Sequence, residues 1–105
     1  MKKFGLVSSA VLMMAGATAA SADEINVVCS ADQGWCDLMV AAFEAENPDT
    51  DVLMVRKSTG ETLAQVRAEA GNPKIDVWWG GTGDPHLTAA EEGLTQASGV
   101  DTSDL

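Results

Sequence analysis

Short apolar runs alternate with longer amphipathic stretches along most of the chain. Three runs rich in Val, Ile and Trp suit strands buried on both faces, and they lie at residues 25–30, 51–56 and 75–79. After each run, apolar side chains recur at helical spacing. This repeated strand–helix order predicts an α/β fold in which a parallel sheet carries helices on both of its faces.

The first two predicted helices have recognisable limits. The first spans residues 34–46 and carries one apolar stripe, formed by Trp35, Leu38, Met39, Ala42 and Phe43. The second opens at a capping-box pattern, in which Ser58 is followed by Glu61, and it stops at the sequence Gly71-Asn72-Pro73.

The third predicted helix spans roughly residues 85–93. Asp84 suits its N-cap, and Pro85 suits its first position because proline lacks an amide hydrogen. Within this helix we expect Leu87 and Ala90 to face inward.

The first 22 residues have the pattern of a secretory signal peptide. Lys2 and Lys3 precede an apolar run over residues 4–15, and the small residues Ala20-Ser21-Ala22 match a cleavage site. The alternative is a membrane anchor, but the run is shorter than the roughly 20 residues that span a bilayer. We expect cleavage after Ala22 and export to the periplasm.

Charge and cysteine content limit the possible partners of the protein and indicate the state of its cysteines. Beyond residue 22, four basic residues against 16 acidic ones give a formal charge of −12, which argues against nucleic acid or anionic membrane as a partner. Cys29 and Cys36 are the only cysteines. In an exported protein we expect them to form a disulfide, and two cysteines do not supply the four ligands of a structural zinc site.

Three strand-to-helix loops are the candidate ligand site. In a parallel sheet with right-handed crossovers these loops meet at the carboxyl ends of the strands, where ligands of such sheets bind. Each loop leads to a helix N-terminus, whose free amides favour an anion. The candidate residues offer hydroxyl groups or unobstructed backbone, and they are Ser30, Ser58, Thr59, Gly60, Gly81, Thr82 and Gly83. The alternative is that the three loops are ordinary caps and turns.

Two cations stand close to these loops. Arg56 and Lys57 close the second strand, where they would pair with a bound anion or simply face solvent.

The stretch VWWGGTGDPH, residues 77–86, allows three interpretations. It is a buried strand with an ordinary turn, a backbone cradle for a ligand, or a metal site that uses Asp84 and His86. One histidine with one carboxylate is weak support for a metal, and Asp84 already suits a helix cap, so we expect no metal site. Trp78 and Trp79 face opposite sides of the sheet, and Trp79 is a candidate to line a cleft.

Catalytic motifs do not emerge from the sequence. The phosphate-binding loop and the dinucleotide glycine fingerprint are absent, and no Ser/His/Asp set predicts a nucleophile. We therefore expect a protein that is not an enzyme and that needs no cofactor.

The segment from about residue 24 to 95 resembles the N-terminal part of periplasmic substrate-binding proteins of bacterial ABC importers. Its most specific pieces are RKSTGETLAQVRAE and DVWWGGTGDPH. The resemblance points to the ferric-iron-binding and phosphorylated-sugar-binding group, which has the type II periplasmic binding fold with two lobes around one solute. Residues 23–95 would then begin the first lobe, and residues 96–105 would be a truncated tail before the missing remainder.

The resemblance implies a function as well as a fold. Contacts from the first lobe would come from Ser30, the Ser58-Thr59-Gly60 loop and the Gly81-Thr82 loop. The ligand would be ferric iron with a synergistic anion, and the alternative is a phosphorylated sugar or other small phosphate-bearing anion. The partner would be an inner-membrane ABC permease, and the protein would act as a monomer. An exported enzyme with catalytic residues elsewhere is the alternative from another class.

Overall fold

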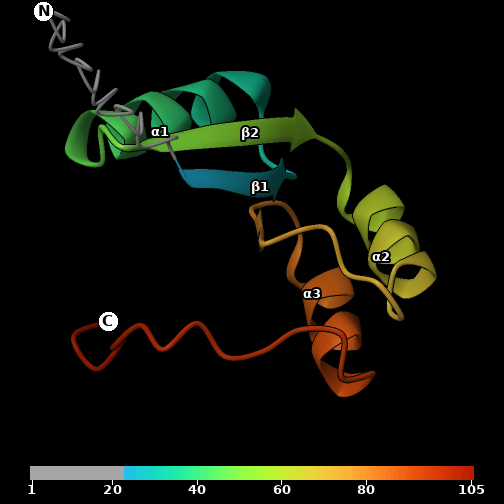
Figure 1. The fold of residues 1–105 in the computed structure, drawn as a ribbon. Helices are drawn as coiled ribbons and strands as arrows, with labels where there is room; N and C mark the ends of the chain where they lie inside the picture. Colours follow the sequence, from blue (N-terminus) through green and yellow to red (C-terminus); the bar gives the residue numbers. More distant parts are fainter. Residues whose placement is uncertain (1–22) are drawn as a thin grey trace, which may run out of the picture.

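The chain folds as three strands that alternate with three helices (Figure 1). The computed structural model describes residues 23–105. The elements are β1 (Asp23–Cys29), α1 (Gln33–Glu46), β2 (Thr50–Arg56), α2 (Thr59–Ala68), β3 (Val77–Trp79) and α3 (Gly83–Glu91). The predicted α/β order is therefore confirmed.

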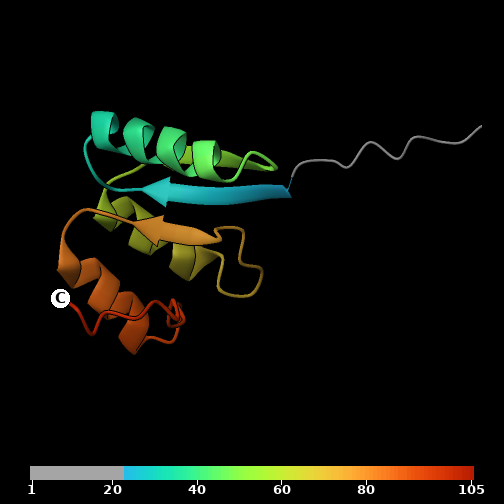
Figure 2. The same ribbon diagram turned by 90° about the vertical axis from the view of Figure 1, so that its left-hand side faces the viewer.

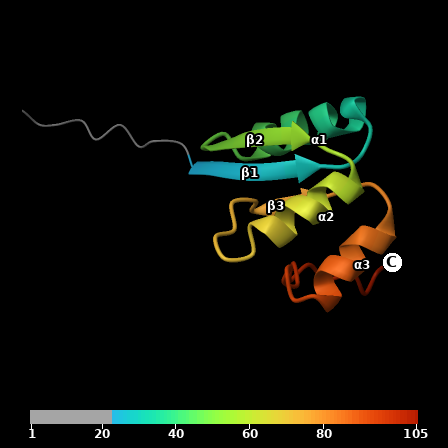
Figure 3. The ribbon, with the colours of Figure 1, turned by 90° about the vertical axis from the view of Figure 1, so that its right-hand side faces the viewer.

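All three strands are parallel, and β1 lies between the other two in the order β2-β1-β3. The strands point the same way, so the starts of α1, α2 and α3 gather at one edge of the sheet (Figure 3). We call this the carboxyl edge. It is the edge at which the three candidate loops were expected to meet.

The helices cover both faces of the sheet, as predicted. In Figure 2, α1 passes in front of the sheet on the side of β2, and α2 lies behind β3. Residues of α1 contact β2, and α2 and α3 pack against each other. Arg67 on α2 and Glu92 after α3 add an exposed ion pair, with Nη2 and Oε2 2.9 Å apart.

Strand β3 is shorter than the run predicted at residues 75–79. The amide of Asp76 donates to the Asn26 carbonyl at 2.9 Å, but the Asn26 amide donates to the Asp76 carboxylate at 2.8 Å instead of to a backbone oxygen. A side chain thus replaces one bond of the ladder. Regular pairing begins only at Val77.

The inward positions of α3 differ from the prediction. Leu87 is 64% exposed and Ala90 is exposed as well, whereas Ala89 is fully buried. The helix starts at Gly83, two residues before the predicted start, and its inward position is the small Ala89. Thr62 on α2 is also fully buried, and small side chains at such positions allow two helices to approach closely.

The apolar stripe of α1 is only partly covered. Trp35 and Leu38 are 62% and 60% exposed. Met39 and Phe43 are also exposed, at 44% and 42%, and they line a groove between α1 and the sheet with a volume of about 180 Å³. The other walls of this apolar groove are Ile25, Val27, Cys29, Cys36, Val40, Val52, Met54, Val77 and Trp79.

The C-terminal segment of the described chain adds no regular element to the fold. Residues 94–105 contain neither helix nor strand. The predicted signal peptide and its cleavage site lie outside the described residues. Within residues 23–105, no helix has the length and apolarity to cross a membrane.

Candidate functional site

The three candidate loops meet at the carboxyl edge around Gly81. Gly80 and Gly81 both have a φ of +82°, a conformation that side chains other than glycine adopt at a cost. A Cβ atom on Gly81 would clash with Cγ2 of Thr59 and would lie 3.0 Å from Cβ and the carbonyl oxygen of Ser30. One glycine from the third loop therefore touches both other loops.

A hydroxyl pair joins the second and third loops. Oγ1 of Thr59 and Oγ1 of Thr82 are 3.0 Å apart, within hydrogen-bond distance. When one hydroxyl donates to the other, the accepting hydroxyl keeps its own hydrogen. The pair therefore offers one donor to a ligand at the junction of the two helix N-termini.

The N-terminus of α2 is capped as predicted. Oγ of Ser58 accepts from the Glu61 amide at 3.2 Å, and the Ser58 carbonyl accepts from the Thr62 amide at 3.0 Å. Within residues 23–105, the amides of Thr59 and Gly60 have no acceptor. These two donors and the positive end of the helix dipole favour a negatively charged group.

The N-cap of α3 is Thr82 and not Asp84. Asp84 lies in the first turn of the helix, and Pro85 follows it there. The prediction placed the helix start too late because it took Pro85 as the first helical residue. Proline is accommodated throughout the first turn, where amide hydrogens lack helical partners. Oγ1 of Thr82 makes no cap bond and pairs with Thr59 instead. Within the described chain, the amides of Gly83 and Asp84 likewise have no acceptor.

Ser30 links the first loop to β3. It is 8% exposed, its amide donates to the Trp79 carbonyl at 2.8 Å, and its Oγ accepts from Nε1 of Trp78 at 3.0 Å. Trp78 is therefore the tryptophan that reaches the loops. Trp79 faces the opposite side, where it lines the apolar groove with α1.

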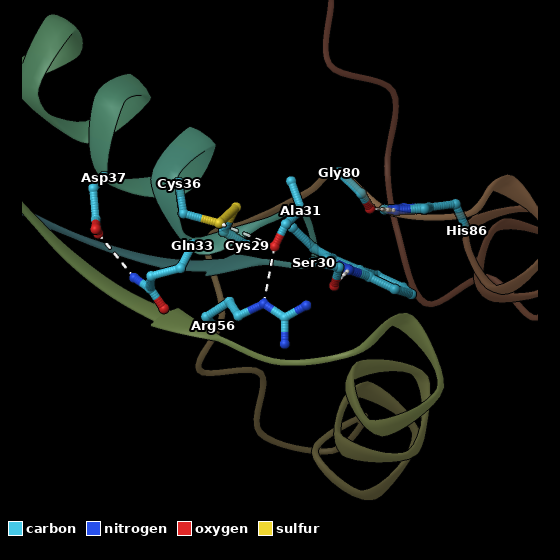
Figure 4. Close-up of a disulfide and its surroundings, with 10 residues drawn as sticks. Cys29, Ser30, Ala31, Gln33, Cys36, Asp37, Arg56, Gly80 and His86 are labelled. Atoms are coloured by element: carbon cyan, nitrogen blue, oxygen red, sulfur yellow. Dashed lines mark hydrogen bonds between the residues drawn. A yellow bond between two sulfur atoms is a disulfide. The ribbon is translucent and has the colours of Figure 1, made fainter.

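The two cations at the end of β2 differ in their surroundings. Nε of Arg56 donates to the Ala31 carbonyl at 2.9 Å while the side chain stays exposed (Figure 4). Nζ of Lys57 donates to Oε1 of Gln65, along α2. Arg56 thus lies beside the first loop, and Lys57 is held toward the helix.

His86 is engaged inside the chain. Its Nε2 is 2.9 Å from the Gly80 carbonyl oxygen, so Nε2 carries a hydrogen and donates it (Figure 4). The ring stacks on Trp78 with 4.0 Å between ring centroids. A nitrogen that donates in this way cannot ligate a metal. Residues 23–105 contain no group of three or more His, Cys, Asp or Glu side chains arranged to hold an ion.

The disulfide between Cys29 and Cys36 is present, and it ties the end of β1 to the first turns of α1 (Figure 4). Both cysteines are 1% exposed. The bond spans the first loop, so it restricts the backbone that carries Ser30.

The structure thus brings Ser30, Thr59, Gly81 and Thr82 into direct contact, and it places Ser58 at the adjacent helix cap. Gly60 and Gly83 are exposed, and a Cβ atom on either would meet nothing within 4 Å. Trp78 and His86 connect the first and third loops, a role that the sequence analysis did not assign to them. The sequence pattern places Trp78 on a strand and His86 on a helix, but it does not show which residues their side chains contact.

No family model matches the chain. An uncharacterised protein of Haemophilus influenzae is 41% identical over an alignment of 98 residues, and the match covers 90% of this chain and 28% of that protein. Among solved structures, the periplasmic binding protein AfuA of Actinobacillus pleuropneumoniae, with exogenous fructose-6-phosphate bound, is 37% identical, with a TM-score of 0.63. The periplasmic binding protein P5PA is 28% identical, also with a TM-score of 0.63.

Each structural match covers 68% of this chain and 22% of the solved protein. The chain therefore spans about a quarter of the length of the proteins that it matches. Its fold is that of part of a periplasmic binding protein, as the resemblance in the sequence implied.

Proposed function

We propose that this chain forms part of the solute site of a periplasmic binding protein that delivers a small phosphate-bearing ligand, such as a sugar phosphate, to an ABC importer. The observation that carries the proposal is the meeting of three loops at the carboxyl edge, with the Thr59–Thr82 hydroxyl pair between two helix N-termini. Capture rather than catalysis is the role that fits this set, because it contains hydrogen-bond donors and no nucleophile–base pair.

A phosphate group suits the donors at this edge. The free amides at the starts of α2 and α3 and the hydroxyl pair are all donors, and they lie on the same edge of the sheet. Phosphate oxygens accept several such bonds at once, and helix N-termini favour the negative charge. The fructose-6-phosphate bound to AfuA, which is 37% identical to this chain, supports the same class of ligand.

Ferric iron is the second candidate, and its support is the sequence resemblance. Residues 23–105 supply no cluster of three metal-ligating side chains, and the sequence has no tyrosine. In the ferric case this edge would hold the synergistic anion, through the same donors, and the metal ligands would come from elsewhere in the protein.

Calorimetry on the complete protein encoded by the gene separates these possibilities. The probes are fructose-6-phosphate, fructose, inorganic phosphate and ferric citrate. We expect saturable binding of fructose-6-phosphate and at least 100-fold weaker binding of fructose, because charged hydrogen bonds contribute about 1.5–3 kcal/mol each. Saturation by ferric citrate alone would favour iron. Saturation by none of the probes would contradict the proposal.

A matched pair of variants tests the location. Thr59→Val keeps the side-chain shape and removes the hydroxyl, so we expect about tenfold weaker binding of fructose-6-phosphate. Thr102→Val makes the same change in the exposed tail and should leave affinity unchanged. Equal affinities of the two variants for fructose-6-phosphate would show that the ligand does not bind at the hydroxyl pair.

A further inference from the structure

The turn at Gly80 and Gly81 has few side chains with which to hold its own shape. Both glycines have positive φ, and the turn is followed by Thr82 and another glycine. Glycine has the largest conformational freedom of any residue in an unfolded or loosened segment. Contacts from outside the turn must therefore fix it if Gly81 and Thr82 are to stay against Thr59.

His86 provides such a contact from the first half of α3. Its Nε2 donates to the Gly80 carbonyl oxygen over 2.9 Å, and the side chain is half-buried. The bond closes a ring between the turn and the helix that follows it. It also directs the Gly80 carbonyl toward the His86 ring.

Trp78 holds the imidazole in place and extends the connection to the first loop. The two rings stack at 4.0 Å with 27° between their planes. Nε1 of Trp78 donates to Oγ of Ser30 at 3.0 Å. Oγ of Ser30 is therefore the acceptor through which the indole contacts the first loop.

We propose that His86, supported by Trp78, is a positioning residue that holds the Gly80–Thr82 turn in its ligand-binding shape. The inference rests on the proposed function, because it assigns these residues to the same phosphate site. Neither side chain needs to touch the ligand. The imidazole acts through the Gly80 carbonyl, and the indole acts through Ser30.

The two properties of His86, its N–H donor and its aromatic ring, can be separated by substitution. His86→Gln places an amide N–H the same number of bonds from Cα and removes the ring. His86→Phe keeps a ring for stacking and removes the donor. Leu87→Gln changes the neighbouring position on α3, which is 64% exposed, and controls for general effects on that helix.

Two measurements on the complete protein test the proposal. The first is the affinity for fructose-6-phosphate, and the second is the NMR order parameter of the Gly80, Gly81 and Thr82 amides without ligand. We expect His86→Phe to bind about tenfold more weakly, as for one lost hydrogen bond. We also expect its order parameters in the turn to fall from about 0.85 toward 0.6. His86→Gln and Leu87→Gln should stay close to the parent protein in both measurements.

The outcomes distinguish this inference from the function on which it rests. If the parent protein binds none of the phosphate probes, the proposed function fails, and the order parameters alone decide whether His86 holds the turn. If the parent binds and His86→Phe matches it in both measurements, the positioning role is wrong. Equal losses in His86→Gln and His86→Phe would overturn the assignment of that role to the N–H donor.

Discussion

The carboxyl edge and the apolar groove lie close to the same disulfide, yet different forces shape them. At the carboxyl edge, Gly81 fits between Thr59 and Ser30, and hydrogen bonds fix the loops. In the apolar groove, side chains such as Met39, Phe43 and Trp79 face one another without directional bonds. Hydrogen bonds depend steeply on distance and angle, whereas apolar contacts tolerate changes of shape at similar volume. We therefore expect the edge to be sensitive to single atoms and the groove to be tolerant.

The largest effect should follow from adding one methyl group at the edge. Gly81→Ala requires a positive φ at alanine and places Cβ against Thr59 and Ser30. We expect urea unfolding to give a loss of about 2–4 kcal/mol and calorimetry to show no measurable sugar-phosphate binding.

Gly34→Ala is the matched control for that change, because it lies in the first turn of α1 with nothing within 4 Å of the added Cβ. It should unfold and bind like the parent protein. Equal behaviour of the two alanine variants would show that the edge is not packed as tightly as described.

Removal of the disulfide should be the next largest effect, and it should reach both regions. Cys29→Ala with Cys36→Ala opens a covalent loop with a sequence separation of 7, so we expect unfolding in urea to require about 2.5 kcal/mol less. Reduction of the parent protein with dithiothreitol should give a similar loss. An unchanged urea midpoint in both cases would indicate that the fold holds the first loop without the bond.

A pair of shape-conserving changes compares the two regions directly. Thr82→Val removes a hydroxyl that makes no cap bond, so we expect about tenfold weaker ligand binding with little change in stability. Met39→Leu in the groove should cost less than about 1.5 kcal/mol and leave binding intact. If Met39→Leu loses affinity while Thr82→Val keeps it, the expected difference in sensitivity between the carboxyl edge and the apolar groove is wrong.

The smallest effect is expected on the exposed stripe of α1. Leu38 is 60% exposed, so Leu38→Gln should change the free energy of unfolding by no more than about 0.5 kcal/mol. Chemical denaturation of the complete protein measures it. Full burial of a leucine side chain contributes at least about 1.5 kcal/mol. A larger loss than this in the free energy of unfolding would mean that another part of the protein covers this stripe.

Local chemistry made much of the fold predictable. The strand–helix order, the Ser58 cap and the disulfide each depend on residues close together in sequence, and each is confirmed. The start of α3 was predicted at the wrong residue because the first turn tolerates proline at more than one position. Local sequence patterns therefore define the start of a helix only to within about two residues.

Only the part of the candidate site that follows from the order and direction of the strands could be predicted. Parallel strands bring the three loops to one edge, so Ser30, Thr59 and Thr82 could be expected near one another. The clash that forbids a side chain at Gly81 and the bond between Trp78 and Ser30 depend on packing between segments about 20 to 50 residues apart. The partners of His86, which are Gly80 and Trp78, lie fewer than ten residues away in sequence. Spacing in the sequence carries no signal for such contacts.

The central position of β1 has a consequence for the order of folding. Asp23 pairs with Thr50, a separation of 27 residues, whereas Val27 pairs with Val77, a separation of 50. Closing the longer loop costs about 0.4–0.6 kcal/mol more in chain entropy, and contacts distant in sequence form more slowly. We expect β1, α1 and β2 to assemble first, so Gly81 and Thr82 join the carboxyl edge only after these three elements have formed.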